Sequence, residues 1–205
     1  MPDRSAIEWT DATWNPTTGC TRVSAGCDHC YAESMSRRLL ATTYRSRLPV
    51  VDTAANRSDP FAVRLWPERL RVPVAWREPR RILVNSMSDL LHRDVPDDFA
   101  CECFRVMLDV DRHVYQVLTK RPARAARFVK RNAELFPNGL PANVWIGTSV
   151  EDQSVDFRVR RAVGRLLVSG RHAGPVGPPG APARLPATSG HIAESLCGSG
   201  PGDCL

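Results

Sequence analysis

Three cysteines near the start of the chain have the residue type and spacing of a metal site. Cys20, Cys27 and Cys30 follow the pattern C-x6-C-x2-C. The last two form a close C-x2-C pair, and Cys20 can reach that pair across a loop that turns at residues 24–26. Three thiolates can hold three irons of a four-iron, four-sulfur (4Fe-4S) cluster and leave the fourth iron open. The spacing therefore predicts a metal site, with a 4Fe-4S cluster as the first interpretation.

A structural zinc site is the alternative interpretation of the same residues. Zinc takes four ligands in such sites, so it needs one donor besides the three cysteines. His29 lies between two of them, and its binding at the same time would strain the loop. His92 or His113 would serve only if folding brings it near. Cys101 and Cys103 lie in a helical apolar pattern, and we predict that they are buried rather than metal ligands.

An iron that no residue binds implies a particular chemistry. In radical S-adenosylmethionine enzymes, the amino and carboxylate groups of S-adenosylmethionine bind that iron. An electron from the cluster then breaks a carbon–sulfur bond, and the resulting 5′-deoxyadenosyl radical removes a hydrogen atom from the substrate. The cofactor supplies this chemistry, while the protein supplies position and shielding from water.

The elements that must position the cysteines alternate along the chain between strands and helices. Short apolar runs that end in polar residues predict strands. The predicted strands are residues 7–16, 81–86, 114–119 and 143–149. Apolar residues at helical spacing predict the helices 31–40, 96–110 and 122–132. This alternation predicts an α/β fold with a parallel sheet and crossover helices.

Two stretches between these elements lack a clear period. Residues 42–59 are polar and aperiodic, and we predict an irregular loop there. Residues 63–70 and 74–79 are interrupted by prolines, which predicts short helices or capping segments. Trp9 and Trp14, in the first predicted strand, are expected to pack in the core.

Polar side chains follow each later strand. Because the carboxyl ends of parallel strands meet at one edge of a sheet, we expect a shared site there, beside the cysteines. The predicted cofactor-binding residues are Asn85, Ser86, Asp89, Thr119, Lys120, Ser149 and Glu151. Ordinary helix caps and turns are the alternative for each cluster taken alone. Lys120 and Arg121 could also hold a carboxylate or a phosphate, and Glu151 could accept ribose hydroxyls.

Length and composition limit the function further. The 205 residues suffice for one domain, and the net charge of +6 permits contact with nucleic acid without demanding it. We find no base-stacking aromatic cluster and no helix-turn-helix pattern. There is no signal peptide and no apolar run of membrane-spanning length, so we expect a cytoplasmic protein without a membrane partner. Seven cysteines in that compartment favour metal binding or catalysis over disulfides.

Five motifs in order carry a resemblance to a known family. They are IEWTDATWNPTTGC-x6-CDHCYAE, VRLWPERL, RRILVNSMSDLLH, VYQVLTKRP and NVWIGTSVEDQ, and the match runs from residue 7 to residue 157. The chain resembles the phage and bacterial three-cysteine family Gp-thirty-seven/Gp-sixty-eight, a domain of unknown function similar to the radical S-adenosylmethionine superfamily. The resemblance implies a partial, open TIM-like β/α barrel of parallel strands with a 4Fe-4S cluster on Cys20, Cys27 and Cys30. It does not supply a substrate.

The sequence departs from the expected pattern in two places. The usual cysteine spacing of the superfamily is C-x3-C-x2-C, whereas here it is C-x6-C-x2-C. The residue before the last cysteine is often aromatic in the superfamily, whereas here it is His29. The second departure is the end of the chain. Residues 160–205 hold most of the thirteen glycines and include the low-complexity run PVGPPGAPARLP. We predict a partial barrel at 1–159 and a disordered or non-native tail at 160–205, with a helix at most near 161–168.

The composition of the tail suggests a truncated copy of the family. It is rich in glycine, proline, alanine and arginine. Such a composition results when GC-rich DNA is translated in a shifted reading frame. We therefore expect a frameshift near residues 158–161 and weak or no activity. We predict an iron–sulfur enzyme of the radical S-adenosylmethionine type whose substrate is unknown. A partner protein is one way in which its site could be completed. The alternative is a phage-related, nucleic-acid-associated accessory protein with a structural zinc site.

Overall fold

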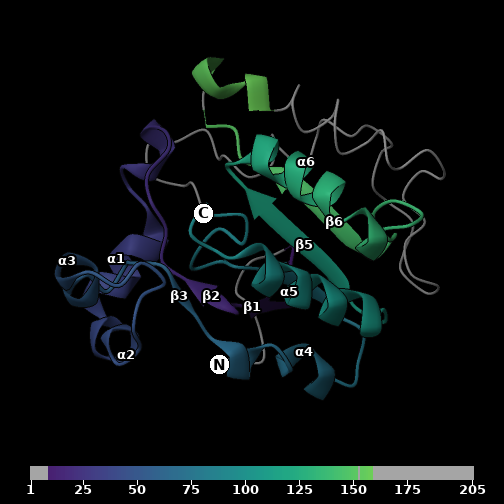
Figure 1. The fold of residues 1–205 in the computed structure, drawn as a ribbon, viewed down its shortest axis with the longest axis horizontal. Coiled ribbons are helices and arrows are strands. Elements are labelled where there is room, and N and C mark those ends of the chain that lie inside the picture. The colour runs from purple at the N-terminus through teal and green to yellow at the C-terminus, as the bar shows by residue number, and fades with distance from the viewer. Residues whose placement is uncertain (1–8, 152, 159–205) are drawn as a thin grey trace.

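A four-stranded parallel sheet organises the computed structural model, which describes residues 9–151 and 153–158 (Figure 1). Its strands are β1 (Ala12–Trp14), β4 (Arg81–Val84), β5 (Val114–Thr119) and β6 (Val144–Thr148). They lie in the order β1-β4-β5-β6, so each strand pairs with the next one along the chain. The four predicted strands and the parallel α/β architecture are confirmed.

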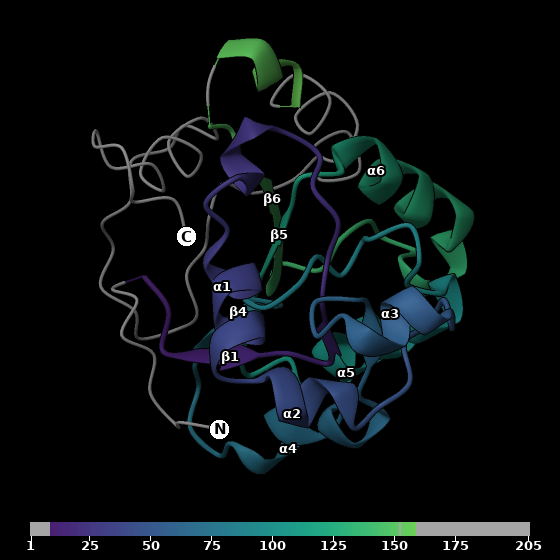
Figure 2. The ribbon, with the colours of Figure 1, turned by 90° about the vertical axis from the view of Figure 1, so that its left-hand side faces the viewer.

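Two long helices cover one face of this sheet. They are α5 (Asp97–Asp109) and α6 (Pro122–Arg131), close to the predicted bounds, and they lie on the same side of the strands in both views (Figures 1 and 2). Right-handed crossovers between successive parallel strands place both helices on one face. Phe104 of α5 and Phe128 of α6 are fully buried, with ring centroids 5.3 Å apart. Trp14 is also fully buried, as expected for a packing residue.

A second group of short elements follows the cysteines. It contains the helices α1 (Tyr31–Arg38), α2 (Ala41–Arg45) and α3 (Ala54–Ser58), and an antiparallel pair of β2 (Thr17–Thr18) with β3 (Arg64–Leu65). The three helices appear at the left of Figure 1. The remaining elements are α4 (Val72–Ala75) and the 3₁₀ turns η1 (Ala25–Cys27), η2 (Pro67–Arg69), η3 (Ala133–Leu135) and η4 (Gln153–Val155).

The prediction of an irregular loop at 42–59 is wrong in part, because α3 and most of α2 fall within it. Each of these helices has five residues, too few to display a helical period. At α3 the side chain of Thr53 accepts a hydrogen bond from the backbone of Asn56, which caps the helix. Arg64 then ties the segment down, since its buried guanidinium donates to backbone carbonyls of Arg47, Asn56 and Ala62.

Several sequence predictions concern residues beyond these elements. The proposed domain boundary at 159/160, the disordered tail and the helix near 161–168 lie outside the described residues. Within residues 9–151 and 153–158, no helix combines the length and the apolar character needed to cross a membrane.

Candidate functional site

The first cysteine is fixed by the backbone around it. Gly19 has a φ of +84°, and a Cβ atom there would lie 2.2 Å from the carbonyl oxygen of Ala62, so only glycine fits. Its N–H donates to the carbonyl of Met87 (3.0 Å), just after β4. The N–H of Cys20 donates to the carbonyl of Phe61 (3.1 Å). Cys20 therefore lies between the segment that follows β4 and the segment that precedes β3.

The other two cysteines lie directly before helix α1. Cys27 ends the 3₁₀ turn η1, and Cys30 is the residue directly before α1. All three cysteines are free thiols of intermediate burial.

Three free thiols are a suitable donor set for a cluster with one open iron. Their sulfurs do not converge, however: in the part of the chain that the structure describes, no three His, Cys, Asp or Glu side chains form a group that could hold a metal ion. His29, His92 and His113 thus do not complete a zinc site there either. The three thiols are chemically suited to bind a cluster, but their sulfur atoms would have to move closer together to do so.

A buried ion pair binds Cys20 to the strand ends. Arg121, which follows β5, donates from Nη1 to a carboxylate oxygen of Asp89 (2.8 Å) and to the sulfur of Cys20 (3.6 Å). Its Nη2 donates to the carbonyl (2.9 Å) and hydroxyl (3.1 Å) oxygens of Thr21. Asp89, which follows β4, also accepts from the hydroxyl of Thr119 (2.9 Å) and the N–H of Lys120 (3.2 Å). Three of the predicted residues, Asp89, Thr119 and Lys120, therefore do lie together.

Charge and burial oppose one another in this network. Burial raises the pKa of the Cys20 thiol, and the Arg121 guanidinium only partly offsets that effect. Burial also disfavours the charge of Arg121, but Asp89 keeps the pKa of Arg121 above its ordinary value. The side chains of Arg121 and Asp89 are 13% and 7% exposed, so the pair is shielded from water.

His92 supports the same segment as a neutral group. Its Nδ1 accepts from the N–H of Asp94 (3.1 Å), so the proton is on Nε2, which donates to the hydroxyl of Thr21 (2.7 Å). Burial, with the nearby Arg121 charge, lowers the pKa of His92 to about 4. The imidazole is thus uncharged at neutral pH and fixes Thr21 beside Cys20.

A second buried network holds the loop between Cys20 and Cys27. Glu151, which follows β6, accepts from the ammonium of Lys120 (2.6 Å), the hydroxyl of Ser24 (2.5 Å) and Nη1 of Arg158 (2.7 Å). Lys120 also donates to the carbonyl of Gly26 (3.4 Å). Burial alone would raise the pKa of Glu151, but the hydrogen bonds from Lys120, Ser24 and Arg158 lower it to about 2. Glu151 is therefore a carboxylate at neutral pH.

Asn85 and Ser86 lie in a separate polar group at the ends of β1 and β4. The Nδ2 of Asn85 donates to the hydroxyl of Thr17 (2.7 Å), and Ser86 exchanges hydrogen bonds with the amide of Asn15 (3.1 and 3.3 Å). Asn85 has a φ of +64°, which is rare for a residue with a side chain. Its Oδ1 is buried and has no hydrogen-bond partner among the described residues. A buried acceptor in that state indicates a missing donor.

The structure thus separates the predicted residues into groups. Glu151 joins Lys120, whereas Ser149 contributes its carbonyl oxygen, which accepts from Arg158 (3.0 Å). Sequence reasoning missed Arg158 and Ser24 as partners of Glu151. Ser24 carried a weak signal, since it is the polar residue of the turn between the first two cysteines.

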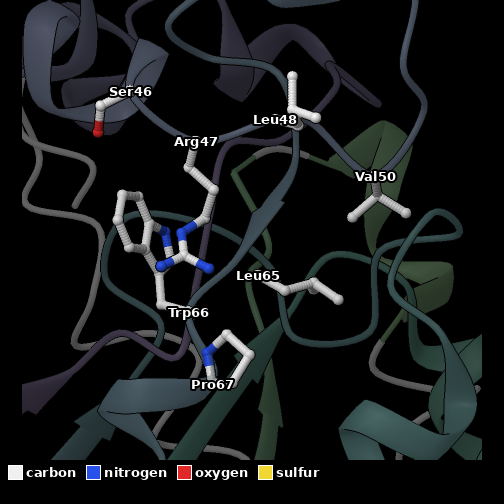
Figure 3. A pocket seen from close by; sticks show the side chains of 7 residues that line it. All are labelled: Ser46, Arg47, Leu48, Val50, Leu65, Trp66 and Pro67. Atoms are coloured by element: carbon white, nitrogen blue, oxygen red, sulfur yellow. The ribbon is translucent and has the colours of Figure 1, made fainter.

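A surface groove of about 540 Å³ lies apart from these residues. It is formed by the segment after α2 and by β3 with the two residues that follow, and Figure 3 shows Arg47 beside the indole of Trp66. The guanidinium carbons of Arg47 and Arg69 lie 4.6 and 3.9 Å from the centroid of that ring. Trp66 is nearly fully buried, so these contacts stabilise the wall of the groove.

A family model described as "Protein of unknown function (DUF5131)" matches residues 4–167. The chain belongs to this family. No curated protein and no solved structure gives a significant match. Membership in the DUF5131 family covers the cysteine segment and all four strand ends described above, but it names neither a cofactor nor a reaction.

Proposed function

We propose that the protein is an iron–sulfur enzyme that uses S-adenosylmethionine, with Cys20, Cys27 and Cys30 as cluster ligands. The observation that carries the proposal is the position of the cysteine segment. Three free thiols lie beside the carboxyl ends of parallel strands, and two buried ionic networks fasten the segment to those ends. Structural loops seldom need buried ion pairs at both ends, because each pair costs desolvation.

The chain's own residues have distinct tasks in this proposal. Arg121 and Asp89 fix Cys20, while Glu151 and Lys120 hold the turn before Cys27. A cluster bound there with one open iron would bind S-adenosylmethionine and supply the electron that cleaves it. The resemblance to the radical S-adenosylmethionine superfamily supports this assignment.

Asn85 offers a contact for the second cofactor. Its unpartnered, buried Oδ1 at the end of β4 requires an N–H or O–H donor. S-adenosylmethionine carries an amino group and ribose hydroxyls, either of which would satisfy it. The same proposal assigns cofactor-binding roles to the other predicted residues, Ser86, Asp89, Thr119, Lys120, Ser149 and Glu151. All of these except Ser149 already form side-chain hydrogen bonds within the protein.

The fold fits an open barrel. Successive strands are neighbours and both crossover helices cover one face, as in part of a β/α barrel. The other face, with Leu83, Gln116 and Leu118 in register, would then line the interior. We place the enzyme in the cytoplasm, where seven cysteines stay reduced.

An assay for 5′-deoxyadenosine tests the proposal. The protein is reconstituted with iron and sulfide without oxygen, then incubated with S-adenosylmethionine and dithionite. We expect a low yield of 5′-deoxyadenosine from the wild type and from Cys101→Ala, in keeping with the weak activity expected from the sequence. We expect none from Cys27→Ala, because two thiolates cannot retain the cluster. A colourless protein that holds one zinc and forms no 5′-deoxyadenosine would contradict the proposal and favour the zinc-bearing, nucleic-acid-associated alternative.

A further inference from the structure

The surface groove beside Trp66 contains an unpaired edge of strand β3. In an antiparallel strand, the N–H and C=O of one residue point to the same side, and that side alternates from residue to residue. The N–H of Trp66 donates to the carbonyl of Pro16 (2.8 Å), on the side of β2. Leu65, one residue earlier, therefore directs its N–H and C=O away from β2. Neither of these two groups has a hydrogen-bond partner among the described residues.

The segment after α2 pairs with this edge at one point and then leaves it open. Val50 donates its backbone N–H to the carbonyl of Val63 (2.8 Å). The preceding residue, Pro49, has no N–H to donate, and in the described structure residues 46–49 form no backbone–backbone hydrogen bond with β3. The groove of about 540 Å³ has both Leu48 and Leu65 in its lining, so it lies where the pairing stops (Figure 3).

The lining of the groove is apolar and open to water. Leu48 is 64% exposed, and Val50 and Leu65 are only partly buried. An exposed strand edge is a template for an extended chain, which pairs through its backbone and places alternate side chains in the neighbouring pockets. The groove therefore offers two backbone hydrogen bonds and an apolar surface to the same peptide.

The charges at the rim of the groove favour an acidic peptide. Arg47 and Arg69 both stack on Trp66, and Arg45, the last residue of α2, is exposed. Glu68 pairs with Arg47 (2.7 Å), so three guanidinium groups and this carboxylate leave a positive rim. Residues 159–205 contain five arginines and two acidic side chains, so their charge does not complement the groove.

We propose that this groove binds an extended acidic segment of another protein. The segment pairs with the N–H and C=O of Leu65 and places an aliphatic side chain between Leu48 and Leu65. This binding requires no metal or cofactor at the cysteines, so it goes beyond the proposed function and is tested separately from it.

Binding of short peptides to the full chain tests the inference. The probe is a fluorescent peptide of sequence DVEVD with blocked ends, and its anisotropy is followed during titration with protein. Two control peptides are KVKVK and a copy of DVEVD in which the three central backbone nitrogens are methylated. We expect DVEVD to bind, the methylated copy to bind about tenfold more weakly because it cannot donate to Leu65, and KVKVK not to bind.

A charge reversal in the protein tests the same groove from the other side. Arg45→Glu should weaken the binding of DVEVD about threefold at low salt and less at high salt. Arg127→Glu, at an exposed position of α6, is the matched control and should bind as the wild type does.

Three results would overturn the inference. They are no binding of DVEVD at millimolar concentration, equal binding of DVEVD and its methylated copy, and equal effects of Arg45→Glu and Arg127→Glu. A wild-type dimer that DVEVD dissociates would also overturn it, because the occupant of the groove would then be a second copy of this chain.

Discussion

The residues around Cys20 show how burial selects the charge state of each group. Thr21 accepts from Nε2 of His92 and from Nη2 of Arg121, so a proton added to His92 would place a second cation beside the guanidinium. The structure therefore requires a neutral imidazole, and the pKa of His92 falls to about 4 because of burial and of Arg121. Asp94 and Asp89 oppose this shift, while Arg93 adds to it.

His92 predicts a pH dependence of folding. Its pKa is about 6.5 in the unfolded chain and about 4 in the fold, so the unfolded state binds more protons between those values. The free energy of unfolding should be highest above pH 6.5 and decrease as the pH falls toward 4. Protonation of His92 should account for about 2–3 kcal/mol of that decrease. Urea unfolding at a series of pH values should show a shallower dependence in His92→Gln. An equal dependence in both proteins would refute the prediction.

Individual residues also show what the sequence could predict. Asp89, Thr119 and Lys120 were expected at one edge because parallel strands end together, and they lie within hydrogen-bond distance. Buried Cys101 and Cys103 were expected from their helical pattern and are confirmed. The contact between Ser24 and Glu151 was missed, because the two residues lie 127 positions apart and only the folded chain brings them together.

At the scale of elements, the turn η1 owes its position to the strand ends opposite it. A Cβ atom at Gly26 would lie 2.0 Å from Cγ of Glu151, so the absence of a side chain lets the carboxylate reach Ser24 and Lys120. The strands and long helices were predictable from their periods. The short helices α2 and α3 were not, because a tertiary contact such as that of buried Arg64 stabilises them.

A double-mutant cycle measures this contact between elements. Gly26→Ala alone should reduce the free energy of unfolding by about 1–3 kcal/mol, since the new methyl group collides with Glu151. In a Glu151→Ala background the same substitution should cost close to nothing, because the colliding atoms are gone. Urea unfolding of the four proteins gives the coupling energy. Additive effects would mean that Gly26 is required for its backbone and not for its approach to Glu151.

At the scale of the described fold, helices cover one face of the parallel sheet more fully than the other. Helices α5 and α6 cover the first face (Figure 2). Gln116, Leu118 and Trp145 on the other face are only partly buried. The consecutive strand order was predictable from the alternation of strands and helices. The open barrel implied by the family resemblance stays a prediction, since four parallel strands do not by themselves define a barrel.

Iron retention in the cysteine variants tests the central claim most directly. Five proteins are reconstituted without oxygen: the wild type, Cys20→Ala, Cys27→Ala, Cys30→Ala and the control Cys101→Ala. The iron content per chain and the visible absorbance of each are then measured. We expect about four irons and a brown colour for the wild type and for Cys101→Ala, and little iron for the other three. A wild type without iron, or a Cys20→Ala protein with as much iron as Cys101→Ala, would contradict the claim that these three cysteines hold a cluster.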